Sequence, residues 1–328
     1  MPSRAAWLRY VVLTSLVLCV SLCTAEDPSL GEIPGNPFRD LPLTADRQSQ
    51  LRSYLTAHKF AAAEELLALE AERASQPAAF LRALADVLFL DSRQSQVIAV
   101  LRKVESLQPL SEHSHFLLAL AYVAVGQTHS ADIEFEGLAE TNPSRATYPY
   151  WRSRLAHRRR DYSQALRFAT KAVDLDPRFT KGLDQLGLCL AAVDNNEQAI
   201  LAFQRAIESA GPEFSHWPWP TFNLGTLYLR LNRLSDAELT LRKSITVERT
   251  FPPAHFRLGQ VLERRGALQD ALKEFKLAIQ LDPTYPDPHY ALARLYRSRS
   301  EKGPAEQELA LFKTLRDTDQ NRGIRRPE

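Results

Sequence analysis

Residues 183–206 read LDQLGLCLAAVDNNEQAILAFQRA, and two apolar patterns in this stretch are separated by a polar segment. The first pattern has the i, i+3, i+4, i+7 spacing of one α-helical face: Leu183, Leu186, Gly187 and Leu190. The second has the spacing i, i+4, i+7: Ala199, Phe203 and Ala206. The polar DNNEQ between them is typical of a turn, so the stretch predicts a hairpin of two helices.

The small residues of the hairpin indicate how its helices pack. Helices pack about 8–10 Å apart, and the closest approach requires small side chains at the crossing. We therefore expect Gly187 and Ala199 where the two helices touch. Ala206 is expected where the second helix meets the next hairpin.

Prolines recur along the chain at a constant interval. Pro109, Pro143 and Pro177 are 34 residues apart, and Pro283 lies 106 residues beyond Pro177, which is three times 34 plus 4. Proline ends helices because it lacks the backbone N–H and clashes with the preceding turn. Evenly spaced helix ends at this period predict a stack of equal structural units.

The hairpin pattern recurs at the same interval. Five other units have Gly or Ala at the position of Gly187: Ala85, Ala119, Gly225, Gly259 and Ala293. The units that start at 180 and 252 match best. The units that start at 44 and 146 depart from the pattern, with Leu51 and Ser153 at this position.

The pattern resembles the tetratricopeptide repeat (TPR) family, whose 34-residue unit has W-x2-L-G-x2-Y, A-x3-F and P. The resemblance implies an all-α, right-handed α-solenoid of about eight helix-turn-helix repeats over residues 44–319. The expected unit starts lie near residues 44, 78, 112, 146, 180, 218, 252 and 286. A four-residue insertion falls in GPEFSHWPWP (211–220). Residues 26–43 are expected to form an extended Pro/Gly-rich leader, and residues 320–328 a disordered tail.

Residues 1–25 are predicted to be a secretory signal peptide. Arg4 and Arg9 precede the apolar run YVVLTSLVLCVSL (10–22), and the small-residue segment CTA follows. The apolar run is short for a membrane span. Two alternatives stay open, namely an uncleaved N-terminal anchor and a lipid anchor at Cys23. The signal predicts an exported bacterial protein, periplasmic or secreted.

Signal cleavage would change the charge and the cysteine content. Of 41 Lys+Arg and 39 Asp+Glu, it removes Arg4 and Arg9 and no acid, which leaves 39 of each. A neutral chain does not favour a nucleic-acid or membrane-surface partner. Only Cys189 would remain, so an intramolecular disulfide is excluded. This thiol lies on an apolar helix face and is expected to be structural.

The sequence contains no arrangement typical of a catalytic or metal site. It has no HExxH motif, Cys/His cluster or phosphate-binding Gly-rich loop. We therefore predict no enzymatic activity, cofactor or metal. The basic run HRRR (157–160) closes a helix, where the helix dipole favours cations, and this role is preferred to nucleic-acid binding.

In arrays of the TPR family, one face of the first helices lines a concave groove. Five aromatic residues recur on the corresponding face: Phe116, Tyr150, Phe222, Phe256 and Tyr290, with Trp219 at its mouth. Six arginines continue the stripe: Arg154, Arg158, Arg230, Arg264, Arg294 and Arg297. Aromatic side chains and arginine are enriched at binding hot spots. We predict that the groove binds an extended, partly acidic peptide or a partner helix. The alternative is that the aromatics pack between neighbouring first helices and only stiffen the array.

These features predict a non-catalytic scaffold or adaptor of the bacterial cell envelope or exterior, with a protein or peptide partner. Two alternatives stay open. One is an architectural component that associates through its ends, since Leu311 and Leu315 are expected to be exposed. The other is an accessory subunit of an enzyme complex.

Overall fold

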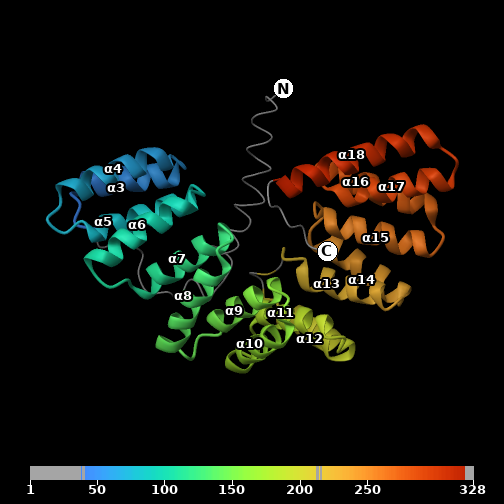
Figure 1. Ribbon diagram of the computed structural model, residues 1–328, viewed down its shortest axis with the longest axis horizontal. Coiled ribbons are helices and arrows are strands. Elements are labelled where there is room, and N and C mark those ends of the chain that lie inside the picture. The colour runs from blue at the N-terminus through green and yellow to red at the C-terminus, as the bar shows by residue number, and fades with distance from the viewer. Residues whose placement is uncertain (1–37, 39–40, 212–213, 215, 322–328) are drawn as a thin grey trace. The chain divides into compact units, whose positions relative to one another are not determined.

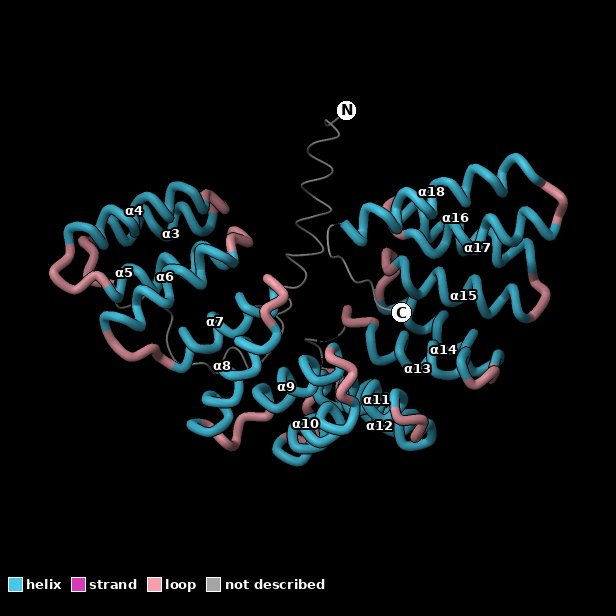
Figure 2. The backbone as a smooth tube through the Cα atoms, viewed as in Figure 1, coloured by secondary structure: helices cyan, strands magenta, loops and turns pink. Residues whose placement is uncertain are grey.

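The computed structural model describes residue 38, residues 41–211, residue 214 and residues 216–321 of the 328-residue chain. The described part contains sixteen α-helices and no strand (Figures 1 and 2). The all-α repeat fold is therefore confirmed. The proposed signal peptide (1–25) and most of the leader lie outside the described residues.

The chain divides between Asp176 and Pro177 into two compact units. The N-terminal unit contains four helical hairpins: α3 (Ala45–Thr56) with α4 (Phe60–Arg73), α5 (Ala78–Leu90) with α6 (Gln94–Leu107), α7 (Glu112–Ala124) with α8 (Thr128–Thr141), and α9 (Thr147–Arg158) with α10 (Tyr162–Leu175). Within this unit, the second helix of each hairpin packs against the first helix of the next.

The C-terminal unit repeats this arrangement with four further hairpins. They are α11 (Thr180–Ala192) with α12 (Asn196–Ser209), α13 (Trp219–Arg230) with α14 (Leu234–Val247), α15 (Pro252–Arg264) with α16 (Leu268–Leu281), and α17 (Pro286–Ser298) with α18 (Lys302–Asn321). Consecutive first helices of this unit also touch. The four-residue insertion precedes α13.

The helices of a hairpin touch at the eighth residue of the repeat, counting each expected unit start as position 1. A Cβ atom added to Gly187 would lie 2.5 Å from the ring of Phe203, and one added to Gly259 would lie 2.5 Å from the ring of Phe275. Ala199 and Ala206 are fully buried. The expected contact at Gly187 is confirmed.

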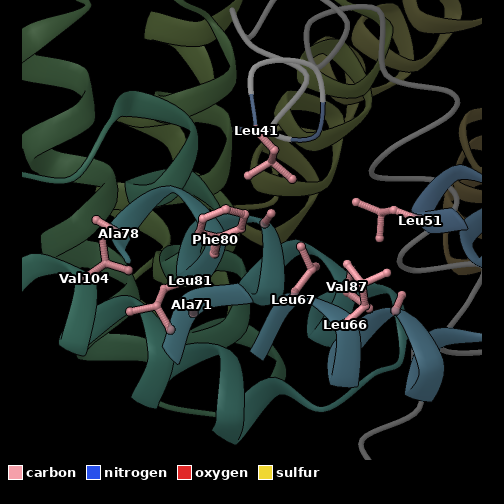
Figure 3. Packing of buried hydrophobic residues seen from close by; sticks show 12 residues of the cluster. Leu41, Leu51, Leu66, Leu67, Ala71, Ala78, Phe80, Leu81, Val87 and Val104 are labelled. Carbon is pink, nitrogen blue, oxygen red and sulfur yellow. The ribbon is translucent and has the colours of Figure 1, made fainter. Parts of the chain in front are cut away.

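The first hairpin packs differently at this position. Leu51 is buried there together with Leu66 and Leu67 of α4 and Val87 of α5 (Figure 3). Leu41, which precedes α3, is buried in the same cluster. A large side chain at the eighth position therefore contributes to the core of the first hairpin.

Every hairpin turn has the same backbone conformation at repeat position 15. All eight residues at this position have a positive φ: His58, Ser92, Gly126, Arg160, Asp194, Asn232, Gly266 and Ser300. At each turn, the N–H of the next residue donates to the carbonyl five residues earlier, at 2.8–3.0 Å. This 6→1 bond is the Schellman motif, which satisfies carbonyls left free at a helix end. All eight turns thus share one geometry, although only two of the residues at position 15 are glycine.

The last helix corrects the expected start of the tail. Prolines occupy repeat position 32 at Pro109, Pro143, Pro177 and Pro283, whereas the last repeat has Asp317 there. Three other repeats lack this proline, with Ser75, Gly211 and Arg249 there, and still end their second helices at position 30, whereas α18 continues to Asn321 and is 20 residues long. Residues 320 and 321, which were expected in the disordered tail, are helical.

The eighth position gives a stability prediction. Gly187→Ala should lower the free energy of unfolding by about 1 kcal/mol, because overpacking costs about 1–3 kcal/mol and the better helix propensity of alanine returns about 1 kcal/mol. Gly137→Ala is the matched control, since Gly137 is an exposed residue of α8 and nothing lies within 4 Å of the added methyl. It should stabilise by up to about 1 kcal/mol. Urea denaturation of both variants measures the two effects, and a stabilising Gly187→Ala would contradict the close contact.

The turn gives a second prediction. Arg160→Gly should stabilise the N-terminal unit by about 0.5–1 kcal/mol, because an L-residue with a Cβ is strained at positive φ. Gly126→Ala, at the same position of the preceding repeat, should destabilise by a similar amount. Thermal unfolding followed by circular dichroism measures both, and equal effects of the same sign would rule out a shared backbone strain.

Candidate functional site

Three of the aromatic residues expected in the groove are buried between helices. Phe116, Phe222 and Phe256 are each 5% exposed or less. The ring of Phe222 lies 5.3 Å from that of Phe251, and the ring of Phe256 lies 5.4 Å from that of Tyr285. Phe251 and Tyr285 immediately precede the first helix of the next repeat. This burial favours the alternative role, in which the rings join consecutive repeats.

Tyr290 occupies the same repeat position but is 48% exposed. It belongs to the last repeat that the structure describes, where no aromatic residue of a following repeat covers it. Its ring instead contacts Phe312 of α18, with 5.1 Å between the centroids. Phe312 stands at repeat position 27, where Ala206 and Ala278 are small. The last repeat therefore partly covers its own end, while Leu311 remains 48% exposed, as expected, and Leu315 is half-buried.

The remaining aromatic residues of the expected groove differ in exposure. Tyr150 is buried, and Arg154 lies over the neighbouring ring of Trp151, 4.5 Å from its centroid. Trp219 is half-buried against Phe251, with 5.0 Å between the ring centroids. Arg158 is exposed at the end of α9.

Two expected arginines of the C-terminal unit bind backbone of the preceding repeat. Arg230 donates to the carbonyl of Ala191 at 2.8 Å, and Arg264 donates to that of Leu229 at 2.9 Å. Both carbonyls lie in the last turn of a first helix, where the helix dipole favours a cation. These contacts hold the guanidinium groups in place. Each group has five N–H donors in total, which is more than these contacts use.

Two further arginines lie on α17. Arg294 forms an ion pair with Glu263 of α15. Arg297 is exposed and has no hydrogen-bond or ion-pair partner among the residues that the structure describes. Among the expected groove arginines of the C-terminal unit, Arg297 thus has the greatest freedom to meet a ligand.

Sequence reasoning gave no binding role to three polar residues on the same side. Asn223 of α13 donates to Asp184 of α11, at 2.9 Å and 3.1 Å to its two carboxylate oxygens. The hydroxyl of Thr226 is buried without a hydrogen-bond partner. These residues stand at repeat positions 5, 6 and 9 of the first helices, on the same helix face as the arginines, and this placement could have identified them.

We define the first-helix face of the C-terminal unit by repeat positions 5, 6, 9, 12 and 13 of α11, α13, α15 and α17. It carries five arginines: Arg230, Arg257, Arg264, Arg294 and Arg297. The carboxylates at these positions are Asp184 and Glu263. The face is therefore basic, although the predicted mature chain is neutral.

The N-terminal unit has an ionisable pair between consecutive first helices. His113 Nε2 of α7 lies 2.6 Å from Asp86 Oδ1 of α5, and Asp86 Oδ2 is buried without a partner. Burial raises the pKa of Asp86, and its interaction with His113 only partly opposes this. Burial lowers the pKa of His113, but the hydrogen bond and charge of Asp86 outweigh it, so this pKa is raised.

In the described part of the chain, no group of three or more His, Cys, Asp or Glu side chains is arranged to hold a metal ion. Nor does any helix there have the length and apolarity needed to cross a membrane.

The model of the tetratricopeptide repeat matches residues 116–178 and 221–286. A solved tetratricopeptide repeat protein from Parabacteroides merdae is 14% identical, with a TM-score of 0.62, covering 84% of this chain and 100% of that one. PilF of Pseudomonas aeruginosa is 20% identical, with a TM-score of 0.55, covering 62% and 91% of the two chains. PilW, a type IV pilus biogenesis factor, is 18% identical, with a TM-score of 0.56, covering 62% and 92%. At these identities the likeness concerns the fold. No curated protein matches the sequence.

The Asp86–His113 pair gives a pH prediction. Both pKa values are raised by folding, so the folded unit binds protons more tightly than the unfolded chain, and its stability falls as the pH rises. For His113 the contribution is complete below its ordinary pKa of 6.5 and is lost as the pH passes the higher folded value. Asp86→Asn should flatten this dependence. Urea denaturation between pH 5.5 and 8.5 measures it, and parallel curves for both proteins would exclude the pair as its source.

Proposed function

Because residues 116–178 and 221–286 match the tetratricopeptide repeat, we propose that this chain is a non-catalytic adaptor that binds an acidic peptide segment on the first-helix face of its C-terminal unit. Proteins built of these repeats typically mediate protein–protein interactions, and the scaffold is generally non-catalytic.

The charge of the first-helix face carries the proposal. Five arginines and two carboxylates share its positions. Arginine binds carboxylates through a rigid fork of donors, and a preorganised fork loses less entropy on binding. Arg230 and Arg264 are held in place by backbone carbonyls of the preceding repeat. Arg297 is free of competing partners in the described structure. An acidic segment would thus meet cations that are already positioned.

The buried aromatic residues take a supporting role in this proposal. Phe222 and Phe256 join the repeats, so they hold the first helices in register and thereby set the spacing of the arginines. Tyr290 and half-buried Trp219 retain exposed ring surface and could contact apolar side chains of the ligand. The ligand is therefore acidic with interspersed apolar residues.

The N-terminal sequence supports an exported location. Residues 1–25 have the basic start, apolar middle and small-residue end of a signal peptide. We therefore place the proposed adaptor in the bacterial periplasm or outside the cell.

A second candidate is an architectural role through association of the C-terminal end. Its support is the exposure of Leu311 and Tyr290, which lie on the last hairpin without a following repeat. Sedimentation velocity distinguishes the two roles, since an architectural role requires concentration-dependent association that Leu311→Glu abolishes.

The adaptor proposal predicts the effect of charge reversal. Arg297→Glu should weaken binding of a fluorescein-labelled peptide of Glu, Asp and Leu at least tenfold, equivalent to about 1.4 kcal/mol, because a forked donor is replaced by a repelling carboxylate. Fluorescence anisotropy at 50 and 300 mM NaCl measures the affinity, which should fall with salt.

The matched control is Lys273→Glu, which makes the same charge change at an exposed site on a second helix, α16. It should leave the affinity within twofold of the unmodified protein. An equal loss in both variants would show that only the overall charge matters, and the assigned face would be wrong.

A further inference from the structure

The N-terminal unit contains an apolar groove of about 500 Å³ between the second helices α4 and α6. Leu84 and Leu88 of α5 and Val100 of α6 contribute its large apolar side chains. The walls include three alanines: Ala61 and Ala68 of α4 and Ala99 of α6. Figure 1 shows α4, α5 and α6 together at the start of the unit. The volume lies within the range of about 300–1,000 Å³ typical of ligand pockets.

The groove exists because one residue is small. Ala68 stands at repeat position 25, where five other repeats have a long polar side chain: Arg102, Glu136, Gln204, Arg242 and Lys276. Three of these side chains cross to the next repeat. Arg102 bonds Glu134 of α8, Glu136 pairs with Arg152 of α9, and Lys276 lies over the ring of Tyr296 of α17. The methyl group of Ala68 is too short to reach the next repeat, so the space beside it stays open in the first repeat.

Carboxylates line the opening. Glu64 and Glu65 border the groove, and α4 carries four glutamates and one arginine. Glu64 accepts from Arg93 through one oxygen, while the other is buried without a hydrogen-bond partner. Glu65 is exposed, with no ion pair among the described residues. A buried oxygen without a donor is costly, so the groove favours an occupant with a cationic donor.

A contact elsewhere in the N-terminal unit shows which kind of side chain can fill the space between two repeats. Arg152 of helix α9, in the fourth repeat, bonds Asp132 and Glu136 of α8 in the third repeat and lies over the ring of Phe168, 4.4 Å from its centroid. One arginine on a helix thus supplies both the charge and the packing between repeats. Alanine walls also let a helix backbone approach closely.

We propose that this groove docks an amphipathic helix of a partner protein, with apolar side chains against Leu84, Leu88 and Val100 and an arginine beside Glu64 and Glu65. This is the helix-in-groove mode of recognition. The site lies between the second helices α4 and α6, with two leucines of α5, and selects a basic ligand. It is therefore distinct from the acidic-peptide site of the C-terminal unit and does not depend on it.

The test uses a fluorescein-labelled, alanine-based 16-residue helix with two leucines four residues apart and flanking arginines. Ala68→Arg should weaken its binding to the full chain at least tenfold, because it places in the groove the side chain that the second repeat has at this position. Glu65→Lys should also weaken binding. Ala310→Arg is the matched control, since it makes the same substitution at the same position of the last repeat, where the site is exposed, and it should have no effect.

Circular dichroism establishes that each variant is folded, and the conservative Ala68→Ser should retain binding. Three results would overturn the proposal. One is equal affinity for a peptide with glutamate in place of arginine. Another is that the helix does not bind at all, while a small apolar dye binds the unmodified protein and no longer binds Ala68→Arg. The third is self-association that Ala68→Arg abolishes while the peptide does not bind, which would identify a second copy as the occupant. Arg297→Glu should leave helix binding unchanged, so failure of either site is distinguishable.

Discussion

The close contact between the two helices of a hairpin is the constraint on which this structure depends. At Gly187 and Gly259 the second helix approaches so closely that an added methyl would overlap a phenylalanine ring. This contact buries Phe203 and Phe275, and it leaves each hairpin with one apolar side that only another hairpin can cover. Each repeat therefore needs its neighbours, and stability becomes a sum of local contacts between adjacent repeats.

Much of this fold was predictable from the sequence, because proline spacing and small residues act locally. The shared turn geometry was not predictable, since the positive φ falls on residues as different as His58, Arg160 and Asp194. There the stacked helices impose a conformation that the residue itself disfavours. The roles of the aromatic side chains were also left open. Phe222 and Tyr290 share one repeat position, and only the presence or absence of a following repeat decides which ring is covered.

The arginines of the C-terminal unit show how one residue type can serve both the stack and a ligand. Arg230 and Arg264 each donate to a backbone carbonyl at the end of the preceding first helix, and Arg230 also donates to Asn196 Oδ1. Spacing alone had suggested cations that point freely into a groove. The backbone contacts reduce that freedom, but they also hold the charges at a fixed interval. An acidic chain gains from charges held at a fixed interval, because the arginine side chains then lose little further freedom on binding.

A stack held by local contacts can acquire a second binding surface with little loss of stability. Replacing the long side chain of repeat position 25 by Ala68 opens a groove without disturbing contacts elsewhere, since each repeat touches only its neighbours. The carboxylates beside it give this groove the opposite charge preference to the basic face of the C-terminal unit. A basic helix and an acidic segment would therefore not compete for one surface. The two proposed sites, which lie on separate units and prefer ligands of opposite charge, would let this protein connect two different partners.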